Sequence, residues 1–528
     1  MMDTTVYTII PPLLAILMVV ITRKVLISLG VGIVASALML ADSKVGEACI
    51  LIWDAVKGIF FSEGALNVSN IYIILFLLIL GVITAFISIS GGSYAFGEWA
   101  MKHIKTRIGA QLVGAFLGVL IFIDDYFNAL AVGQVSRPIT DRHKIPRAKL
   151  AYLIDSTSAP VCVIMPVSSW GAYIIALIGG IFMTHQVTEY SSISAFIQMI
   201  PMNFYAIAAL AMVFIVIYRN WNIGPMKLHE ERAVAEGILY NPSKTVPGEL
   251  KEDLPRSKTG RIADLVVPIV TLIVGTVAAM IWTGYQAVAG HATLLTIFEN
   301  TNVTKSLVMG GTMGMIVTII MFSRQVFVLR GVSFNAFPRG VKNGIGSMLP
   351  AVYILLFAWT IVDLIGRLGT GQYLAGLVQD SNLSVSFLPL ILFIIAGLMS
   401  FATGTSWGSF GILLPIAGEI AAATDSTMIL PAMAAVLAGA VFGDHCSPIS
   451  DTTILSSTGA CANHIDHVLT QVPYALISAG IAVAGYMVLG FTGSTMLGLG
   501  TVIVLLAVLV LVIKPQNGEK LDNKMIRS

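Results

Sequence analysis

Two polar segments, each set within a long apolar stretch, carry most of the residues that could do chemistry in this chain. Segment 155–172 reads DSTSAPVCVIMPVSSWGA, and segment 444–460 reads DHCSPISDTTILSSTGA. Polar, proline-broken backbone cannot face lipid, because nothing there would satisfy its N–H and C=O groups, but it is tolerated where it lines a cavity. A pair of such segments, one in each half of the chain, is typical of a transporter binding site.

Three aspartates in these segments are candidate Na⁺ ligands. Asp155 opens the first segment, and Asp444 and Asp451 bracket the break in the second. A carboxylate at the centre of a membrane costs at least about 2.5–3.5 kcal/mol, so its presence indicates a function. Asp444 and Asp451 could also bind a proton near neutral pH, so that Na⁺ and H⁺ would exclude each other. His445 beside Asp444 could relay that proton, whereas Asp155 could also cap the helix that follows.

A second pair of carboxylates, Asp124 and Asp125, lies in the middle of the apolar stretch 109–136. Both could face one cation from a non-helical turn, although the pair could also form a solvated turn. Hydroxyl groups at three places would complete the ion or substrate site. They are Ser156, Thr157 and Ser158; Thr403, Thr405 and Ser406; and Ser447, Ser450 and Thr452. The small residues of 403–409 could equally serve close helix packing.

The composition places these segments in a membrane. Of the 528 residues, 56% are hydrophobic and 11% are charged, whereas soluble domains carry about 25% charged residues. The sequence therefore predicts an all-α polytopic membrane protein. A net charge of +2 with the basic residues in loops argues against nucleic acid as a partner. Since no nucleotide-binding motif is present, we expect no enzyme activity and no cofactor, with transport driven by ion gradients.

The histidines and cysteines near the second polar segment do not favour a zinc site. Cys446 and Cys461 are 15 residues apart, or about 22 Å if the segment is mostly helical. That separation is too long for one tetrahedral site. His464, Asp466 and His467 fall at the expected cytoplasmic end of a span, where we expect a solvated, proton-exchanging cluster.

The basic loops fix the orientation of the apolar stretches. Stretch 109–136 has basic loops on both sides, so it must enter and leave the membrane on the cytoplasmic side. Divided in two, each arm has about 14 residues, or roughly 21 Å of helix, which falls short of the roughly 30 Å hydrocarbon core. We therefore expect a re-entrant hairpin here and a second one, entering from outside, at 385–421.

The two halves then share one plan, which is two inverted repeats of five transmembrane helices plus one re-entrant hairpin each, with one extra C-terminal helix. The parts are the first repeat 1–218 with hairpin 109–136 and broken helix 148–182, the cytoplasmic linker 219–261, the second repeat 262–490 with hairpin 385–421 and broken helix 428–460, and the extra helix and cytoplasmic tail 491–528. We also expect segment 7–22 to be the first span, and segments 50–62 and 331–343 to be interfacial helices.

Several motifs support a family resemblance. The run 443–453 (GDHCSPISDTT) resembles the signature of the NhaC family of sodium/proton antiporters, and its continuation to residue 474 is similar too. So are the runs 124–128 (DDYFN) and 149–160 (KLAYLIDSTSAP). The resemblance implies membership of the ion transporter superfamily, with inverted repeats, two opposed hairpins and often a dimer that moves by an elevator-like mechanism. It also implies a bacterial inner (plasma) membrane location, and we expect a homodimer.

Two functions fit these observations. The leading one is a Na⁺/H⁺ antiporter that exchanges Na⁺ for H⁺ by alternating access. The alternative is a Na⁺-coupled transporter of an organic solute, either an amino acid or a small carboxylate such as malate or lactate. The glycines and hydroxyls of 403–409 would leave room for such a solute, and Asp124 or Asp125 could bind its ammonium group. A channel is less favoured, because inverted broken repeats suit alternating access.

Overall fold

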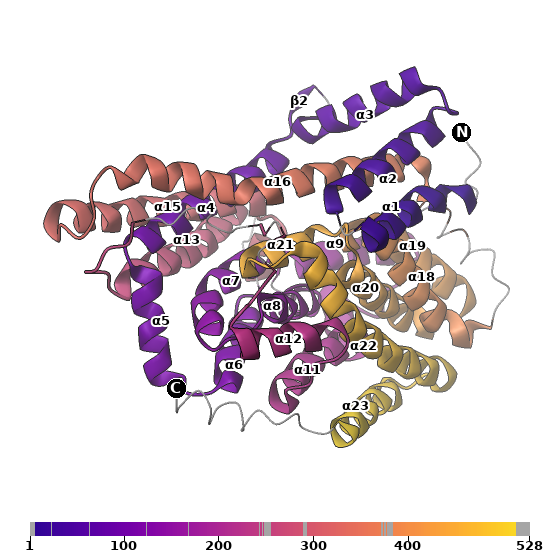
Figure 1. The fold of residues 1–528 in the computed structure, drawn as a ribbon. Helices are drawn as coiled ribbons and strands as arrows, with labels where there is room; N and C mark the ends of the chain where they lie inside the picture. Colours follow the sequence, from indigo (N-terminus) through magenta and orange to yellow (C-terminus); the bar gives the residue numbers. More distant parts are fainter. Residues whose placement is uncertain are drawn as a thin grey trace.

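The computed structural model is nearly all-helical (Figure 1). It describes residues 6–513 except 23, 63, 123, 167, 242, 245, 248–254, 289–292, 371–372, 374–375 and 377–383. The expected tail beyond residue 513 therefore lies outside the described residues, as does part of the expected linker.

The first half of the chain is helical apart from one short hairpin of strands. Its helices are η1 (Val6–Ile9), α1 (Ile10–Thr22), α2 (Val25–Leu40), α3 (Val45–Phe60), α4 (Val68–Ile89), α5 (Gly92–His103), α6 (Arg107–Leu120), α7 (Asp125–Arg142), α8 (Arg147–Cys162), α9 (Ser169–Thr184), α10 (Ser192–Met199), η2 (Ile200–Met202), α11 (Phe204–Arg219) and α12 (Pro225–Glu236). Strands β1 (Phe61–Ser62) and β2 (Ala65–Leu66) pair antiparallel between α3 and α4.

The second half contains longer helices. They are α13 (Ala263–Ala287), α14 (Leu294–Glu299), α15 (Val303–Ser323), the π-helical turn η3 (Arg324–Val328), α16 (Ala336–Leu368), η4 (Val385–Phe387), α18 (Leu388–Thr403), α19 (Ser406–Thr424), η5 (Ser426–Met428), α20 (Ile429–Cys446), α21 (Asp451–Ala460), α22 (His464–Thr492) and α23 (Thr495–Val512). The first backbone N–H groups of a helix have no partner within the helix, so a side-chain oxygen often accepts a hydrogen bond from one of them. Many helices in both halves begin in this way, and Ser450 caps α21.

The length and composition of the helices identify a polytopic membrane protein. Among the described residues, eight helices are long and apolar enough to cross a membrane, or up to ten if each of two bent pairs is counted as one span. One bent pair is α2 with α3, which meet at 120°, and the other is the α10–η2 segment with α11, at 51°. Because apolar side chains face outward from these helices without a protein partner, as on α23, the surface suits a lipid environment.

The helices form two groups, which Figure 1 shows one above the other. In the upper group α4 packs against α15 and α16, α13 packs against α15, and α16 also contacts α2 and α3. The lower group contains α6 to α9, α11 and α18 to α22, with α23 on its outer side. Buried side chains such as Ile174, Phe410 and Met433 form the core of this lower group. The polar segments predicted to be functional all lie in the lower group.

Each stretch that was expected to form a hairpin or a broken helix contains two consecutive helices. Helices α6 and α7 are joined at residues 121–124, and α18 and α19 are joined at 404–405. Helix α8 ends at Cys162 and α9 begins at Ser169, while α20 ends at Cys446 and α21 begins at Asp451. The first arm of each hairpin packs against the broken helix of its own half, as α6 on α8 and α18 on α20. The second arm also packs against the opposite break, as α7 on α21 and α19 on α9.

One expectation about the outer helices was wrong. Segment 7–22, the expected first span, forms η1 and the 13-residue α1, and its role as a span stays a prediction. Segment 331–343 is not a separate interfacial helix, because residues from Ala336 onward belong to the continuous 33-residue helix α16. Pro338 does not interrupt this helix, because proline is tolerated in the first turn, where its missing N–H has no partner anyway.

Candidate functional site

The tip of the first hairpin places two carboxylates in different roles. Asp124 is the N-cap of α7 and accepts a hydrogen bond from Phe127 N at 3.0 Å. Asp125 is 2% exposed and accepts a hydrogen bond from Trp170 Nε1 of α9 at 2.9 Å. Its other oxygen, Oδ2, is buried and has no hydrogen-bond partner among the described residues. The adjacent pair therefore does not act as one bidentate unit.

The side chains around this tip fix its position against α8. Asn128 Nδ2 donates to Gly118 O at 2.6 Å and to Ile121 O at 2.8 Å, so it closes the non-helical turn. Ser158 Oγ donates to the Asp125 backbone carbonyl at 2.8 Å. Thr157 Oγ1 donates to its own helix, to Leu153 O at 2.7 Å. Of the predicted hydroxyl ligands in α8, Thr157 and Ser158 thus have structural partners.

The second hairpin tip meets the second break at Asp444. Ser406, the first residue of α19, donates to Asp444 Oδ2 from its hydroxyl at 2.7 Å and from its backbone N–H at 3.2 Å. Asp444 is 1% exposed, and its Oδ1 has no hydrogen-bond partner in the part of the chain that the structure describes.

The remaining polar residues of the second tip hold the turn together. Gly404 ends α18 with φ at +70°, and a Cβ there would lie 2.8 Å from Ile449 O of the break. Ser447 Oγ donates to Phe401 O at 2.8 Å, and Thr403 Oγ1 donates to Met399 O at 2.8 Å. The Thr405 carbonyl accepts hydrogen bonds from the hydroxyls of Ser400 and Ser409 at 2.8 and 3.2 Å. These contacts fit the packing alternative for this turn.

Asp451 connects the second break to the first hairpin. Its Oδ2 accepts a hydrogen bond from the hydroxyl of Tyr126, in the first turn of α7. Its Oδ1 accepts one from Thr452 N at 2.9 Å. Ser450, the N-cap of α21, also lies 2.9 Å, oxygen to oxygen, from the Thr452 hydroxyl. Because Tyr126 directly follows Asp125, the carboxylates of the first tip and the second break belong to one connected region.

Asp155 occupies a separate polar network in the middle of α8. It is fully buried and accepts hydrogen bonds from Ser456 Oγ of α21 at 3.0 Å and from Gln471 Nε2 of α22 at 2.5 Å. His467 Nε2 lies 3.4 Å, and His445 Nε2 lies 3.8 Å, from Asp155 Oδ2. Asp155 does not cap a helix, because it lies well inside α8.

His445 belongs to the Asp155 network. Its Nε2 lies 3.1 Å from Ser156 Oγ, and its Nδ1 lies 2.7 Å from the hydroxyl of Tyr205 in α11. Gln471 Nε2 also donates to the His445 carbonyl at 2.5 Å. Gln471 therefore links Asp155 of α8 to the end of α20. The contacts of its ring are thus with groups around Asp155, although His445 directly follows Asp444 in the chain.

The expectation that His464, Asp466 and His467 form a solvated cluster was wrong. They are 1%, 8% and 0% exposed. His464 lies between Ser457 Oγ at 3.0 Å and Pro448 O at 2.8 Å, and Asp466 pairs with Lys244 of the linker. The hydrophobic pattern of the sequence ends near these residues. The start of α22 nevertheless packs against α21 and contacts the linker, so it is buried and does not lie at the protein surface.

Sequence reasoning placed His467 in a solvated cluster, and it assigned no role to Tyr126, Tyr205, Ser456 or Gln471. All five side chains contact the predicted aspartates or His445. The four-residue spacing of His467 and Gln471 puts both on one face of α22, which was a usable signal. Tyr205 lies in an apolar helix and has no local signal of its own.

Aromatic rings stand beside the first tip. Trp170 and Trp407 lie 5.7 Å apart, ring centre to ring centre, in an edge-on arrangement, and Trp170 also contacts Phe410 at 5.6 Å. Because Trp170 hydrogen-bonds Asp125, this aromatic cluster links the first hairpin to α19 of the second. Within the described residues, no group of three or more His, Cys, Asp and Glu side chains could hold a metal ion. Any cation in this region would therefore depend on hydroxyl and backbone oxygens as well as carboxylates.

Many apolar spanning helices, with buried aspartates in or beside the two broken helices, fit a membrane transporter, and the family match identifies a transporter and not an enzyme. The model of the Na⁺/H⁺ antiporter family matches residues 161–491, and the chain belongs to this family. This match confirms the resemblance inferred from the motifs.

Three of the proteins that are similar to this chain come from Haemophilus influenzae and Bacillus subtilis. An uncharacterised protein of Haemophilus influenzae is 47% identical over 515 residues, which cover 97% of this chain and 96% of that protein. An uncharacterised Na⁺/H⁺ antiporter of the same organism is 33% identical over 149 residues, 27% of this chain and 31% of its own length. The malate-2H⁺/Na⁺-lactate antiporter of Bacillus subtilis is 33% identical over 166 residues, 30% of this chain and 34% of its own length.

Proposed function

We propose that this protein is a Na⁺/H⁺ antiporter that exchanges Na⁺ for H⁺ by alternating access, without a cofactor. One observation carries the proposal. Two buried carboxylates, Asp125 and Asp444, each keep one oxygen without a hydrogen-bond partner among the described residues. A buried polar group in that condition is costly. Either a proton or a cation would satisfy such an oxygen, and the two cannot do so together.

The chemistry of the surrounding groups suits a small hard cation. Asp444 keeps its orientation because Ser406 binds Oδ2 with two hydrogen bonds, which leaves Oδ1 available. Asp451 is similarly oriented by Tyr126 and by Thr452 N. The break between α20 and α21 and the two hairpin tips bring non-helical backbone close by. We propose that Na⁺ binds Asp444 with Asp451 and nearby oxygens, and that H⁺ competes for Asp444.

The Asp155 network is proposed as the second part of the site. His467, His445 and Gln471 surround Asp155, and Ser156 and Tyr205 extend the network to α8 and α11. Imidazole and hydroxyl groups in such a chain can pass protons between neighbours. We propose that the histidine partners of Asp155 carry protons in this way. Asp155 itself stays a predicted Na⁺ ligand.

The cross-packing of the hairpins supports the proposed inverted repeats. Each hairpin contacts its own broken helix with the first arm and the opposite break with the second arm, so exchanging the two halves preserves this pattern. We propose the repeat bounds 1–218 and 262–490, with opposed hairpins that alternately expose the site. Labelling of single cysteines at the two tips from either side of sealed vesicles tests this. Access to both tips from one side only would contradict it.

A second candidate is a Na⁺-coupled carrier of an organic solute. One relative is named for malate, lactate and Na⁺, and the aromatic cluster of Trp170, Trp407 and Phe410 beside Asp125 could pack against an organic ligand. The two functions differ in one observable. A Na⁺/H⁺ antiporter exchanges Na⁺ for protons when no organic solute is present, and a carrier of an organic solute does not. We further propose a homodimer in a bacterial inner membrane, which cross-linking in native membranes tests.

Calorimetry of the purified protein tests competition at one carboxylate. Titration with Na⁺ in buffers of different ionisation enthalpy reports the protons released on binding. We expect proton release with the wild type and loss of both Na⁺ binding and proton release with Asp444→Asn. Na⁺ binding without proton release would contradict the competition between Na⁺ and H⁺.

A further inference from the structure

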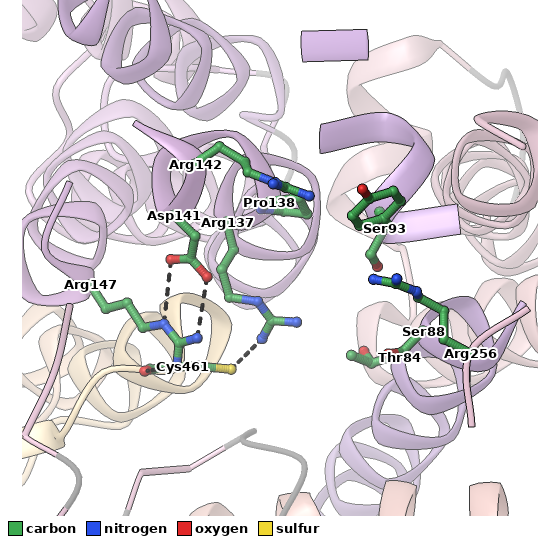
Figure 2. A pocket seen from close by; sticks show the side chains of 11 residues that line it. Thr84, Ser88, Ser93, Arg137, Pro138, Asp141, Arg142, Arg147, Arg256 and Cys461 are labelled. Carbon is green, nitrogen blue, oxygen red and sulfur yellow. Dashed lines mark hydrogen bonds and ion pairs between the residues drawn. The ribbon is translucent and has the colours of Figure 1, made fainter. Parts of the chain in front are cut away.

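A pocket lined by four arginines lies between the two groups of helices, away from the carboxylate site. Its volume is about 460 Å³. Helices α7 and α8 supply Arg137, Arg142 and Arg147, and the linker supplies Arg256. Helices α4 and α5 complete the opposite wall with hydroxyl side chains and Tyr94. Figure 2 shows Arg137 and Arg142 of α7 on one side of the pocket and Arg256 on the other, with Arg137 donating a hydrogen bond to Cys461 Sγ.

The positive charge of this pocket is only partly balanced. Arg147 forms a two-pronged contact with Asp141, at 3.4 Å from Nε and 3.2 Å from its terminal nitrogen. Arg142 lies 3.4 Å from Glu98, but both side chains are more than one-third exposed, so this pair is weak. Neither Arg137 nor Arg256 has an ion pair within the described residues.

Tyr94 keeps two of these charges close together. The guanidinium of Arg256 lies 4.1 Å from the centre of the Tyr94 ring, and that of Arg142 lies 4.9 Å from it. Each cation–π contact contributes about 0.5–1 kcal/mol at an exposed site, and the two like charges repel each other. An anion between the guanidinium groups would remove that repulsion. The Tyr94 ring thus contacts two of the four arginines that line this pocket.

We infer that this pocket binds a phosphate group. Guanidinium groups match phosphate with parallel N–H···O bonds and do so better than lysine. Ser88 and Ser93 offer further hydroxyl donors on the opposite wall. The group could arrive as inorganic phosphate or as the headgroup of an anionic phospholipid, because basic pockets between membrane helices accept such headgroups. This inference stands independently of the proposed ion exchange.

A bound phosphate would contact both groups of helices at once. Arg137 belongs to the hairpin that carries Asp125, whereas Ser88 and Ser93 belong to α4 and α5 of the other wall. Phosphate binding should therefore stabilise the arrangement described here against movement of one group past the other. The expected consequence is a higher unfolding temperature of the full-length protein when phosphate is bound.

Thermal unfolding of the purified protein tests the inference. One arm adds sodium phosphate in detergent, with sodium chloride at matched ionic strength and matched Na⁺ concentration as the control. The other arm compares nanodiscs of phosphatidylglycerol with nanodiscs of phosphatidylcholine. We expect stabilisation in at least one arm and a decrease of about tenfold in apparent affinity for Arg137→Gln or Arg256→Gln. Arg339→Gln, an exposed arginine on α16, should behave as the wild type.

The two arms identify the source of the phosphate group. Stabilisation by sodium phosphate indicates a soluble anion, and stabilisation by phosphatidylglycerol alone indicates a lipid. If the Arg→Gln variants are not monodisperse, Arg137→Lys and Arg256→Lys retain the charge and should still show weaker binding. No stabilisation in either arm, or equal stabilisation of wild type and folded Arg137 and Arg256 variants, would overturn the inference.

Discussion

Ser406 at the second hairpin tip donates two hydrogen bonds to Asp444 at the end of α20, at 2.7 Å from its hydroxyl and 3.2 Å from its backbone. Both bonds go to Oδ2, and Oδ1 accepts none within the described residues. The hairpin thus orients the carboxylate. A movement of the tip would change the environment of Asp444 directly, which gives a physical link between hairpin position and ion binding.

Ser406→Ala should weaken Na⁺ binding without abolishing it. The change removes the 2.7 Å hydroxyl bond and keeps the backbone bond, so the carboxylate loses part of its orientation. A lost hydrogen bond to a charged group costs about 1.5–3 kcal/mol, which corresponds to a roughly tenfold to hundredfold rise in the apparent Na⁺ constant in a transport assay. Ser409→Ala is the matched control, because within the described residues that hydroxyl hydrogen-bonds only the Thr405 carbonyl. Equal effects of the two changes would remove Ser406 from the site.

Asp451→Asn should abolish Na⁺-dependent transport, because it removes a charge from the proposed cation site. Tyr126→Phe should reduce transport less, since it removes only the donor to Asp451 Oδ2. Asp363→Asn serves as the control for loss of one carboxylate, because Asp363 forms a partly exposed pair with Arg367 at 2.8 Å. Wild-type Na⁺ affinity in the folded Asp451 variant would show that this aspartate is not a ligand.

Asp155→Asn should also abolish Na⁺-dependent transport. The change removes the charge that faces His467 and His445 and disturbs the hydrogen bonds from Ser456 and Gln471. Asp155→Glu keeps the charge and is expected to retain part of the activity. His467→Gln should shift the pH profile of transport more than it changes the protein yield. An unchanged profile would show that His467 is not one of the proposed proton carriers.

Gly133→Ala should destabilise the contact between the first hairpin and α21. A Cβ at Gly133 would lie 2.4 Å from the backbone of Gly459, and overpacking of this kind costs about 1–3 kcal/mol. Gly346→Ala in α16 meets no atom within 4 Å and should be neutral or stabilising, since alanine favours helix. The midpoint of thermal unfolding checks both. A Gly133 variant as stable as the wild type would show that the helices can separate freely here.

The linker helix α12 should make stability depend on pH through Glu230. Burial would raise the pKa of this carboxyl, but Lys149 and Arg107 outweigh burial and lower its pKa below the ordinary value. Arg107 lies 2.6 Å and Lys149 3.8 Å from the Glu230 oxygens. Because the folded pKa is depressed, the stabilisation is present above about pH 4.3 and is lost as pH falls through the folded value.

Glu230→Gln should therefore lower stability at pH 7 by about 3–5 kcal/mol, because it leaves two buried cations without their partner. The difference from the wild type should shrink at acid pH, which unfolding midpoints at several pH values check. Glu231→Gln is the neighbouring control, since Glu231 forms an exposed ion pair with Lys227. A deficit of the Glu230 variant that is the same at every pH would contradict this assignment.

The breaks and hairpin tips could be predicted because they interrupt hydrophobic sequence with residues of special backbone behaviour. Asp124 as a helix cap, Gly404 with positive φ and the polar run after Cys446 all act locally. The carboxylates followed from the same local signals, because charge is rare inside membrane segments.

The partners of the carboxylates could not be predicted in the same way. The contacts of Asp155 with His467 and of Asp451 with Tyr126 join residues that are far apart in the sequence, and one sequence does not show which helix faces pack together. The same limit explains the error at His464, because burial of that helix start depends on α21 and the linker.

Transport by the purified protein in proteoliposomes tests the central claim most directly. Vesicles loaded with acid buffer and no organic solute receive radioactive Na⁺ outside, while an internal dye reports pH. The account predicts Na⁺ uptake coupled to internal alkalinisation in the wild type, and neither signal in Asp444→Asn. If the wild type takes up Na⁺ only when an amino acid or small carboxylate is added, with no proton movement, exchange of Na⁺ for H⁺ is contradicted and the organic-solute function takes its place.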